Sequence, residues 1–235
     1  MPKLLITNCT VEDATEMAHN NIPAFWQDQN WRYPWVNFGL ENLIKATVDR
    51  YPRNQLLKNR DTLRHFKAVD PETGKLIGYI RWQLPANRCK NEDGHPVWPE
   101  GQVPDVSPED REAFNKKAAA AEWKPQDFGD DDHFDDVFAR RRDVLVAERE
   151  YIILDYLAVH PDNQGKGIGS ALVKHGIQKA RELGIDVFVL AFASGFKVYT
   201  NAGFDVLETF DQDATKVGGT EHYIVRLMEL RVKKD

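Results

Sequence analysis

The chain has 235 residues, of which 42% are hydrophobic and 29% charged, a composition typical of a globular protein with a sizeable core. No apolar run approaches the roughly 20 residues that cross a bilayer, and the first residues lack a secretory-leader pattern, so we expect a cytoplasmic protein without membrane association. The net charge of −6 is uneven, because residues 92–136 hold 14 acidic and 4 basic side chains while the rest of the chain holds 23 and 27. A body without a concentrated basic face argues against nucleic acid as the main partner.

The first third of the chain predicts one strand, two helices and a hairpin. The strand covers residues 3–8, and the following helix starts after a capping box at Thr10 and is expected to be interrupted at Pro23. A second helix with apolar residues at helical spacing is predicted over residues 38–51. Two β-like runs then flank the glycine-containing turn at residues 70–74, which is typical of a hairpin.

Residues 85–147 are rich in proline and acidic side chains, so much of this segment is predicted to be loop. One helix is signalled by Ser107 as N-cap with proline after it, and a second is expected between residues 133 and 148. We interpret the segment as an acidic, partly helical insertion within a single domain that spans residues 1–235.

From residue 150 onward the pattern alternates between strands and helices. The first run is nearly continuously apolar, as in a strand that is covered on both faces. The predicted strands are residues 151–159, 187–192, 204–210 and 223–230, the helices are 168–183 and 195–202, and Gly218-Gly219 joins the last two strands. The sequence therefore predicts an α/β fold, with a mixed twisted sheet flanked by helices and an insertion before its central strand.

Three glycines lie between the apolar strand and the next helix, in the run Gln164-Gly165-Lys166-Gly167-Ile168-Gly169. Residues without a Cβ permit a tight turn and leave the first N–H groups of the helix pointing outward, an arrangement that binds phosphate oxygens. A Walker loop is excluded because no Ser or Thr follows the lysine. A dinucleotide fingerprint fits only in part, since Ser170 holds its third glycine position and Asp186 opens the next strand instead of closing it. A tight turn without a ligand is the remaining alternative.

The run Val159-His160-Pro161-Asp162-Asn163-Gln164-Gly165-Lys166-Gly167-Ile168-Gly169-Ser170 resembles the pyrophosphate-binding motif of the GNAT acetyltransferases. Thirty residues further on, Tyr199-Thr200-Asn201-Ala202-Gly203-Phe204 is similar to the second signature of that family. The clear resemblance covers residues 151–208 and is closest to fungal-type small-molecule members. It implies a GNAT-like fold and acetyl-CoA as the acyl donor.

By the same resemblance, the end of the central strand pairs with the pantetheine arm and the glycine turn takes the pyrophosphate. The implied cofactor-binding residues are Leu157, Ala158, Val159, Gln164, Gly165, Lys166, Gly167, Ile168, Gly169, Ser170, Ser194 and Tyr199.

Acetyl transfer to an amine also requires a general acid and a general base. The resemblance makes Tyr199 the candidate acid that protonates the leaving thiolate, and a tyrosine packed in the core is the alternative. Some relatives carry a glutamate where this chain has Ile153, so Asp155, expected on the same face of the strand, is the candidate base. Glu148 and Glu150 are further candidates, and a carboxylate satisfied by neighbouring donors is an equal alternative for Asp155.

The acceptor site of this fold usually involves the loop between the first two helices, which here is rich in aromatic side chains. The candidate substrate-binding residues are Trp26, Trp31, Tyr33 and Trp35. A satellite core under the insertion is an equal alternative to an acceptor pocket. Asp130 to Asp132, with Asp135 and Asp136, lack the spacing of a calcium loop and are interpreted as a solvated face or as a patch that attracts amines. His133 and His160 are expected to be structural or exposed.

The leading hypothesis is an acetyl-CoA-dependent N-acetyltransferase that moves an acetyl group to a primary amine of a small molecule by direct attack in a ternary complex. A protein N-terminal or lysine acetyltransferase is the alternative enzyme, and a non-catalytic acyl-CoA sensor is the alternative outside catalysis. We expect a monomer or homodimer. Cys9 and Cys89 lie far apart and outside metal-ligand spacing, so reduced thiols and no metal site are expected.

Overall fold

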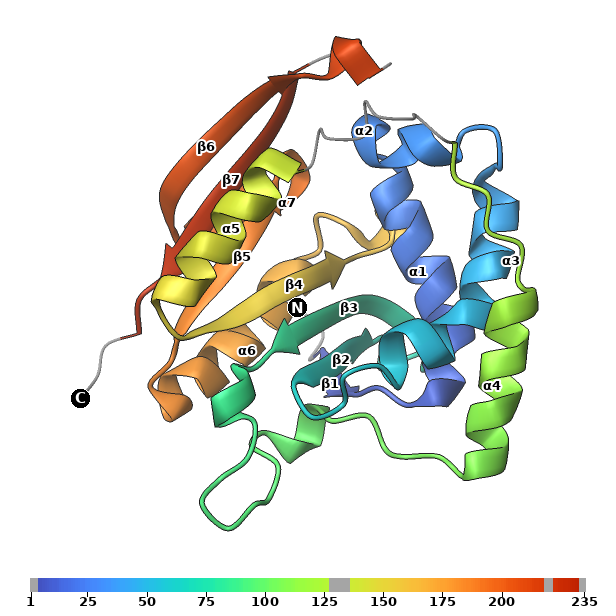
Figure 1. Ribbon diagram of the computed structural model, residues 1–235, viewed down its shortest axis with the longest axis horizontal. Coiled ribbons are helices and arrows are strands. Elements are labelled where there is room, and N and C mark those ends of the chain that lie inside the picture. The colour runs from blue at the N-terminus through green and yellow to red at the C-terminus, as the bar shows by residue number, and fades with distance from the viewer. Residues whose placement is uncertain (1–3, 127–135, 218–221, 233–235) are drawn as a thin grey trace.

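The computed structural model describes residues 4–126, 136–217 and 222–232, and its centre is a seven-stranded sheet (Figure 1). The strands lie in the order β1-β2-β3-β4-β5-β7-β6. Only β4 and β5 run parallel, and every other neighbouring pair is antiparallel, which confirms the predicted mixed sheet. The strands are β1 Leu5–Asn8, β2 Leu63–Val69, β3 Leu76–Gln83, β4 Tyr151–Ala158, β5 Asp186–Phe192, β6 Asp205–Asp213 and β7 His222–Leu230.

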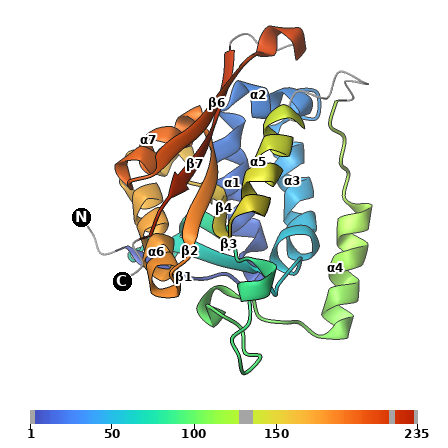
Figure 2. The ribbon, with the colours of Figure 1, turned by 60° about the vertical axis from the view of Figure 1, so that its left-hand side comes forward.

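Helices cover both faces of this sheet (Figure 2). They are α1 Ala14–Trp26, α2 Gln29–Arg32, α3 Leu40–Tyr51, α4 Pro108–Ala120, α5 Asp136–Glu148, α6 Ile168–Leu183 and α7 Ala193–Asn201. The apolar side chains of α6 and α7 pack on one face, while those of α1 and α5 pack on the other. Within the described ranges, no helix has both the length and the apolar character that a membrane span requires.

Strand β3 shows how the two cores are separated. Trp82 and Ile80 point toward α6, whereas Tyr79 points toward α1, as the alternation of a strand requires. A Cβ atom on Gly176 of α6 would lie only 2.1 Å from the indole ring of Trp82. The missing side chain at Gly176 therefore lets α6 approach β3 closely. This contact sets the distance between the sheet and the helix that begins at the glycine turn.

Strands β4 and β5 pair over only half of their length. The parallel register begins at Tyr151 with Asp186 and ends at Leu154 with Val189. Beyond Leu154, β4 pairs with β3 alone, and a register shift there leaves Asp155 as an extra residue opposite β3. A bulge of this kind bends a strand and breaks the alternation of its side chains. The central strand is thus present as predicted, and it separates from its neighbour at its carboxyl end.

The expectation that Pro23 interrupts the first helix is wrong, because α1 continues through this residue to Trp26. Proline lacks an N–H group, so the helix loses one hydrogen bond there. Ile22 and its neighbours remain buried against the rest of the core, and this burial holds the last turn in place. The capping box was predicted correctly, since Asp13 Oδ2 accepts a hydrogen bond from the Thr10 N–H at 2.8 Å.

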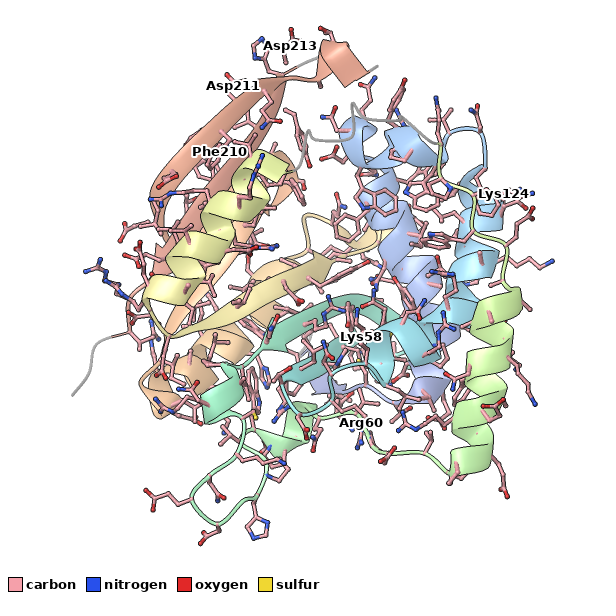
Figure 3. The ribbon with its side chains drawn as sticks, in the orientation of Figure 1. Lys58, Arg60, Lys124, Phe210, Asp211 and Asp213 are labelled. Atoms are coloured by element: carbon pink, nitrogen blue, oxygen red, sulfur yellow. The ribbon has the colours of Figure 1, made fainter. Side chains whose placement is uncertain are left out.

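The insertion contacts both ends of the sheet. Its proline-rich first part is attached by the fully buried Arg64, which donates to the Val97 carbonyl at 2.9 Å. The predicted cap of α4 is present, with Ser107 Oγ accepting from the Asp110 N–H at 3.0 Å, and α4 packs on α3. At the other end of the insertion, Phe138 of α5 packs against Phe210, which Figure 3 labels on β6.

Several sequence-based expectations lie outside the described residues. One set is the acidic run with its histidine, namely Asp130, Asp131, Asp132, His133 and Asp135. The other is the predicted connection Gly218-Gly219 between the last two strands. The side chain of Asp136 is also outside the description.

A buried carboxylate joins the first residues of β4 to β7. Glu229 is only 4% exposed and accepts hydrogen bonds from the Tyr151 hydroxyl at 2.7 Å, from Arg231 Nε at 2.7 Å and from Arg149 Nη1 at 3.2 Å. Burial alone would raise the pKa of Glu229, but these hydrogen bonds and the two arginine charges outweigh it and lower the pKa below the usual 4.5. The network fixes the paired half of β4, opposite the end that separates from β5.

We expect Glu229→Gln to lower the free energy of unfolding at neutral pH by about 1 to 3 kcal/mol, because a charge-assisted acceptor is lost from a buried site. A carboxyl group whose pKa is lowered by folding stabilises the protein above the pKa of the unfolded chain, and this contribution disappears as the pH falls through the folded pKa. Urea denaturation of both proteins between pH 7 and pH 3 measures the difference. A difference that stays constant below pH 4.5 would contradict this account of Glu229.

Candidate active site

A cleft of about 870 Å³ opens where β4 and β5 separate. It is lined by the carboxyl end of β4, the glycine turn, α6, β5, α7 and the junction of α1 with α2. All but one of the residues expected to hold the acyl donor line it, namely Leu157, Ala158, Val159, Gln164, Gly165, Gly167, Ile168, Gly169, Ser170, Ser194 and Tyr199. The exception is Lys166, whose ammonium group bonds to Asn163 Oδ1 at 2.9 Å.

The glycine turn forms one wall of the cleft. Gly165 and Gly167 have φ values of +74° and +79°, in the left-handed region that side chains disfavour. A Cβ atom at either position would meet nothing within 4 Å, so backbone conformation and not lack of space explains the need for glycine. Helix α6 begins directly after the turn at Ile168, and the N–H groups of its first turn have no partner within the helix. This wall has the geometry and the helix polarity that an anion requires.

Asn20 of α1 holds the opposite wall, which is the free end of β4. The side chain is 2% exposed; its Nδ2 donates to the Ala158 carbonyl at 3.2 Å and its Oδ1 accepts from the His160 N–H at 3.0 Å. Gln164 adds a third bond to this segment, because its Nε2 donates to the Val159 carbonyl at 3.1 Å. Two side-chain amides therefore take the backbone groups that no neighbouring strand pairs, and they fix the end of β4 in an extended conformation.

Tyr199 of α7 lies at the side of the cleft that β5 and α7 form. The ring is 5% exposed, packs beside Phe204 at 5.7 Å and contacts Gly195, where a Cβ would lie 2.8 Å from the ring. Burial raises the pKa of the Tyr199 hydroxyl, so the phenol stays protonated at neutral pH, as a proton donor must. Ser194 lines the same side of the cleft, near the start of α7.

Asp155 also lines the cleft, but it has a strong partner. Arg81 donates to it from Nε at 2.9 Å and from Nη2 at 2.8 Å, and Arg81 Nη1 bonds to Gln55. Accepting a proton would cost Asp155 its charge-assisted hydrogen bonds, which argues against the expected role as general base. The assumption that Asp155 shares a face with Ile153 also lapses, because the strand alternation does not continue through the bulge.

The other two base candidates lie outside the cleft. Neither Glu148 nor Glu150 is among its lining residues. Glu150 bonds to Asn87 and pairs with Arg88 at 3.1 Å, both at the beginning of the insertion. These contacts place Glu150 at the paired end of β4, away from the opening between the strands.

The far end of the cleft is aromatic and acidic. Trp31 lines it as expected, together with Phe25, whose ring lies 5.4 Å from the Trp31 ring and 5.0 Å from that of Tyr156. The carboxylate of Asp28 lines the same end and caps α2, accepting from the Trp31 N–H at 3.2 Å. Trp26, Tyr33 and Trp35 do not line the cleft, and the two tryptophans pack against the core of α1 and α3. The aromatic stretch is therefore mostly satellite core, with Trp31 turned to the cleft.

Sequence reasoning missed a polar chain behind this end of the cleft. Asn21 Nδ2 donates to the Tyr51 hydroxyl at 3.3 Å, and the hydroxyls of Tyr51 and Tyr156 are 3.3 Å apart. Burial raises the pKa of Tyr156, so this phenol also remains neutral. The signal for Asn20 and Asn21 was two amides beside the apolar stripe of a predicted helix, since buried polar groups need partners.

A second hollow, of about 560 Å³, lies beside Arg60, which Figure 3 labels. Arg60 and Arg111 both line it, and both pair with Asp105, at 2.9 Å and 2.5 Å. Both guanidinium groups already share the carboxylate of Asp105, and none of the glycine-turn residues lies there. We therefore place the site in the larger cleft. In the described part of the chain, no group of three or more His, Cys, Asp or Glu side chains is arranged to hold a metal ion.

Comparison with known proteins agrees with this placement. Residues 112–204 match the model of the acetyltransferase (GNAT) family. No curated protein matches the sequence. A structure from Corynebacterium glutamicum, described as histone acetyltransferase HPA2 and related acetyltransferase, is similar at a TM-score of 0.56 and 19% identity, over 99% of this chain and 98% of that one.

Two further solved structures share the fold. An agmatine N-acetyltransferase in its apo form gives a TM-score of 0.51 at 15% identity, covering 97% of this chain and 99% of that one. The ribosomal-protein-S18-alanine N-acetyltransferase from Escherichia coli gives a TM-score of 0.50 at 13% identity, covering 99% of this chain and 96% of that one. The family match spans the glycine turn and α7, which line the cleft. Together, these observations show that residues 112–204 resemble the acetyltransferase (GNAT) family and that the chain has the fold of solved acetyltransferases.

Proposed function

We propose that this protein transfers the acetyl group of acetyl-CoA to a primary amine of a small molecule, by direct attack while both substrates are bound. The observation that carries the proposal is the division of the cleft into two chemically different ends. One end holds the glycine turn and the start of α6, while the other holds aromatic rings and the carboxylates of Asp28 and Asp155. Carboxylates and aromatic faces attract an ammonium group, which is the form that most primary amines take near neutral pH.

At the donor end, the backbone amides that begin α6 would take the pyrophosphate of acetyl-CoA. The free edge of β4, from Asp155 to Ala158, offers backbone groups that the pantetheine arm can pair with as a strand would. An N–H group on this edge would also stabilise the oxyanion that forms at the thioester carbonyl. Asn20 supports these contacts because it holds the Ala158 carbonyl and the His160 N–H in place.

For the chemical step, we propose that the Tyr199 hydroxyl donates a proton to the sulfur as the C–S bond breaks. The phenol is protonated at neutral pH and lies on the wall of the cleft formed by α7. The bound ammonium group first loses one proton to solvent, and the neutral nitrogen then forms the new C–N bond as the C–S bond breaks. The second proton that the nitrogen loses restores the Tyr199 phenol through solvent. Asp155 then attracts and orients the amine, while the hydrogen bonds from Arg81 hold the carboxylate in position.

Isothermal titration with acetyl-CoA, followed by a thiol-release screen of amines, tests the function. The panel contains polyamines, arylalkylamines and agmatine, the substrate in the name of one structural relative, with peptides as a separate arm. We expect the wild-type protein to release thiol with small amines. The Gly167→Glu variant should release none, because it places a carboxylate in the glycine turn. Activity confined to peptides would favour a protein acetyltransferase, and tight binding of acetyl-CoA with only background release would favour a sensor.

Asn20→Ala should weaken acetyl-CoA binding by roughly tenfold, because the end of β4 loses two hydrogen bonds that no strand replaces. Titration calorimetry measures the affinity, and His19→Ala is the matched control, since that neighbouring side chain is exposed and bonds only to its own helix. Wild-type affinity for acetyl-CoA in a folded Asn20→Ala protein would show that the two hydrogen bonds of Asn20 do not organise the donor end.

Tyr199→Phe should lower kcat by roughly tenfold or more with little change in acetyl-CoA affinity, since the hydroxyl acts only as the thiolate leaves. Steady-state kinetics and calorimetry on the same preparation separate the two quantities. The variant keeps the ring against Gly195, so packing is preserved. An unchanged kcat would make Tyr199 a packing residue.

Asp155→Asn should reduce kcat/KM for the amine at every pH and leave the rising limb of the pH–rate profile in place. The reason is that both carboxylate oxygens of Asp155 already accept hydrogen bonds from Arg81, so we propose that Asp155 orients the amine and does not take its proton. Profiles from pH 6 to pH 10, with acetyl-CoA binding as the control, decide the matter. Loss of the rising limb would restore Asp155 as the general base.

A further inference from the structure

The insertion touches the acceptor end of the site through one short segment. Residues 121–126, which we call the strap, leave the end of α4 and run along α3 toward α2 (Figure 1). Figure 2 shows α4 on the outer side of α3, away from the sheet. The strap reaches the acceptor loop, defined here as residues 28–38, which contains the cleft residues Asp28 and Trp31.

Ring contacts and backbone hydrogen bonds join the strap to the acceptor loop. The indole of Trp123 packs edge-on against that of Trp35, with 4.6 Å between ring centroids, and the Arg50 guanidinium of α3 lies 4.0 Å from the centroid of Trp123. The Gln126 N–H donates to the Pro34 carbonyl at 2.6 Å. Asn37 Nδ2 also donates to Gln126 Oε1 at 3.4 Å. The strap thus contacts the acceptor loop at Pro34, Trp35 and Asn37.

The acceptor loop has little regular structure of its own. Its helix α2 contains four residues, and a single turn of 3₁₀-helix from Tyr33 to Trp35 follows. Helices this short are not stable alone, so neighbouring contacts must hold the loop. On the inner side, Phe38, Trp31 and Trp35 pack into the core formed with α1 and α3. On the outer side, among the described residues, the contacts of the strap hold it.

We propose that the strap positions the acceptor loop and so determines which amines the cleft accepts. Trp123 is then a positioning residue, which acts through Trp35 on the wall formed by Trp31. The inference rests on the proposed function, because it concerns the acceptor half of the same cleft. The donor half does not depend on the strap, since the glycine turn and β4 are held by α6, β3 and Asn20.

This arrangement makes a specific prediction about kinetics. Trp123→Ala should raise KM for a preferred amine by roughly fivefold, and it should reduce the ratio of kcat/KM between a slender and a bulky primary amine by roughly threefold. The acetyl-CoA affinity should remain within about twofold of wild type. Trp123→Phe keeps an aromatic ring over Trp35 and should recover most of the selectivity.

Lys124→Ala is the matched control. Lys124 is the next residue of the strap and is labelled in Figure 3, and its ammonium group pairs with Glu122 at 2.5 Å and not with the acceptor loop. This variant should keep wild-type KM and selectivity. If Lys124→Ala changes the selectivity as much as Trp123→Ala does, the effect does not come from the Trp35 contact and the proposal fails.

Hydrogen exchange separates this proposal from the proposed function. In Trp123→Ala, the amides of Trp31, Arg32 and Phe38 should exchange faster, because each donates a hydrogen bond within the acceptor loop. The amides of the first turns of α1 should not change. Unchanged exchange in the acceptor loop overturns the positioning role of the strap, whether or not the wild type acetylates amines. Faster exchange with unchanged selectivity overturns the link to specificity, and a wild type that acetylates no amine overturns the proposed function instead.

Discussion

The separation of β4 from β5 after Leu154 is the constraint around which the rest of the molecule is arranged. A parallel pair that ends halfway leaves the N–H and C=O groups of Asp155 to Ala158 without a partner on one side. Backbone groups in such a position are costly unless something bonds to them. The bulge at Asp155 and the side-chain amides of Asn20 and Gln164 share this task. Tyr151 at the other end of β4 is bonded to Glu229, and β5 is paired with β7 from Val187 to Phe192.

The sequence predicted the parts of the fold in which one local signal dominates. Apolar runs located the strands, the capping box located the start of the first helix, and the three glycines located the turn that forms one wall of the cleft. Where tertiary contacts decide, prediction failed. Helix α1 continues through Pro23 because its apolar residues are buried, which propensity alone does not reveal. The bulge at Asp155 depends on the register with β3, a partner that lies before a long insertion.

The site shows the same difference between what local sequence signals reveal and what tertiary contacts decide. The donor half is almost continuous in sequence, so a motif contains it, and eleven of its twelve expected members line the cleft. The acceptor half is assembled from α1, α2 and β4, and only Trp31 of its four expected residues reaches the cleft. Phe25 and Tyr156 were missed because nothing local distinguishes a phenylalanine or tyrosine of the core from one at a cavity. The pairing of Asp155 with Arg81 was equally invisible, since the two residues meet only across β3 and β4.

The insertion leaves the sheet after β3 and returns at β4, and these two strands are neighbours. Any change of length between them therefore leaves the sheet register intact, and the entropy of closing a longer loop rises only with the logarithm of its length. A lineage that lengthens, shortens or replaces this segment can alter the acceptor loop while the wall formed by the glycine turn stays as it is. Acceptor preference in relatives of this chain would then diverge through insertions and deletions more readily than through point substitutions in the cleft.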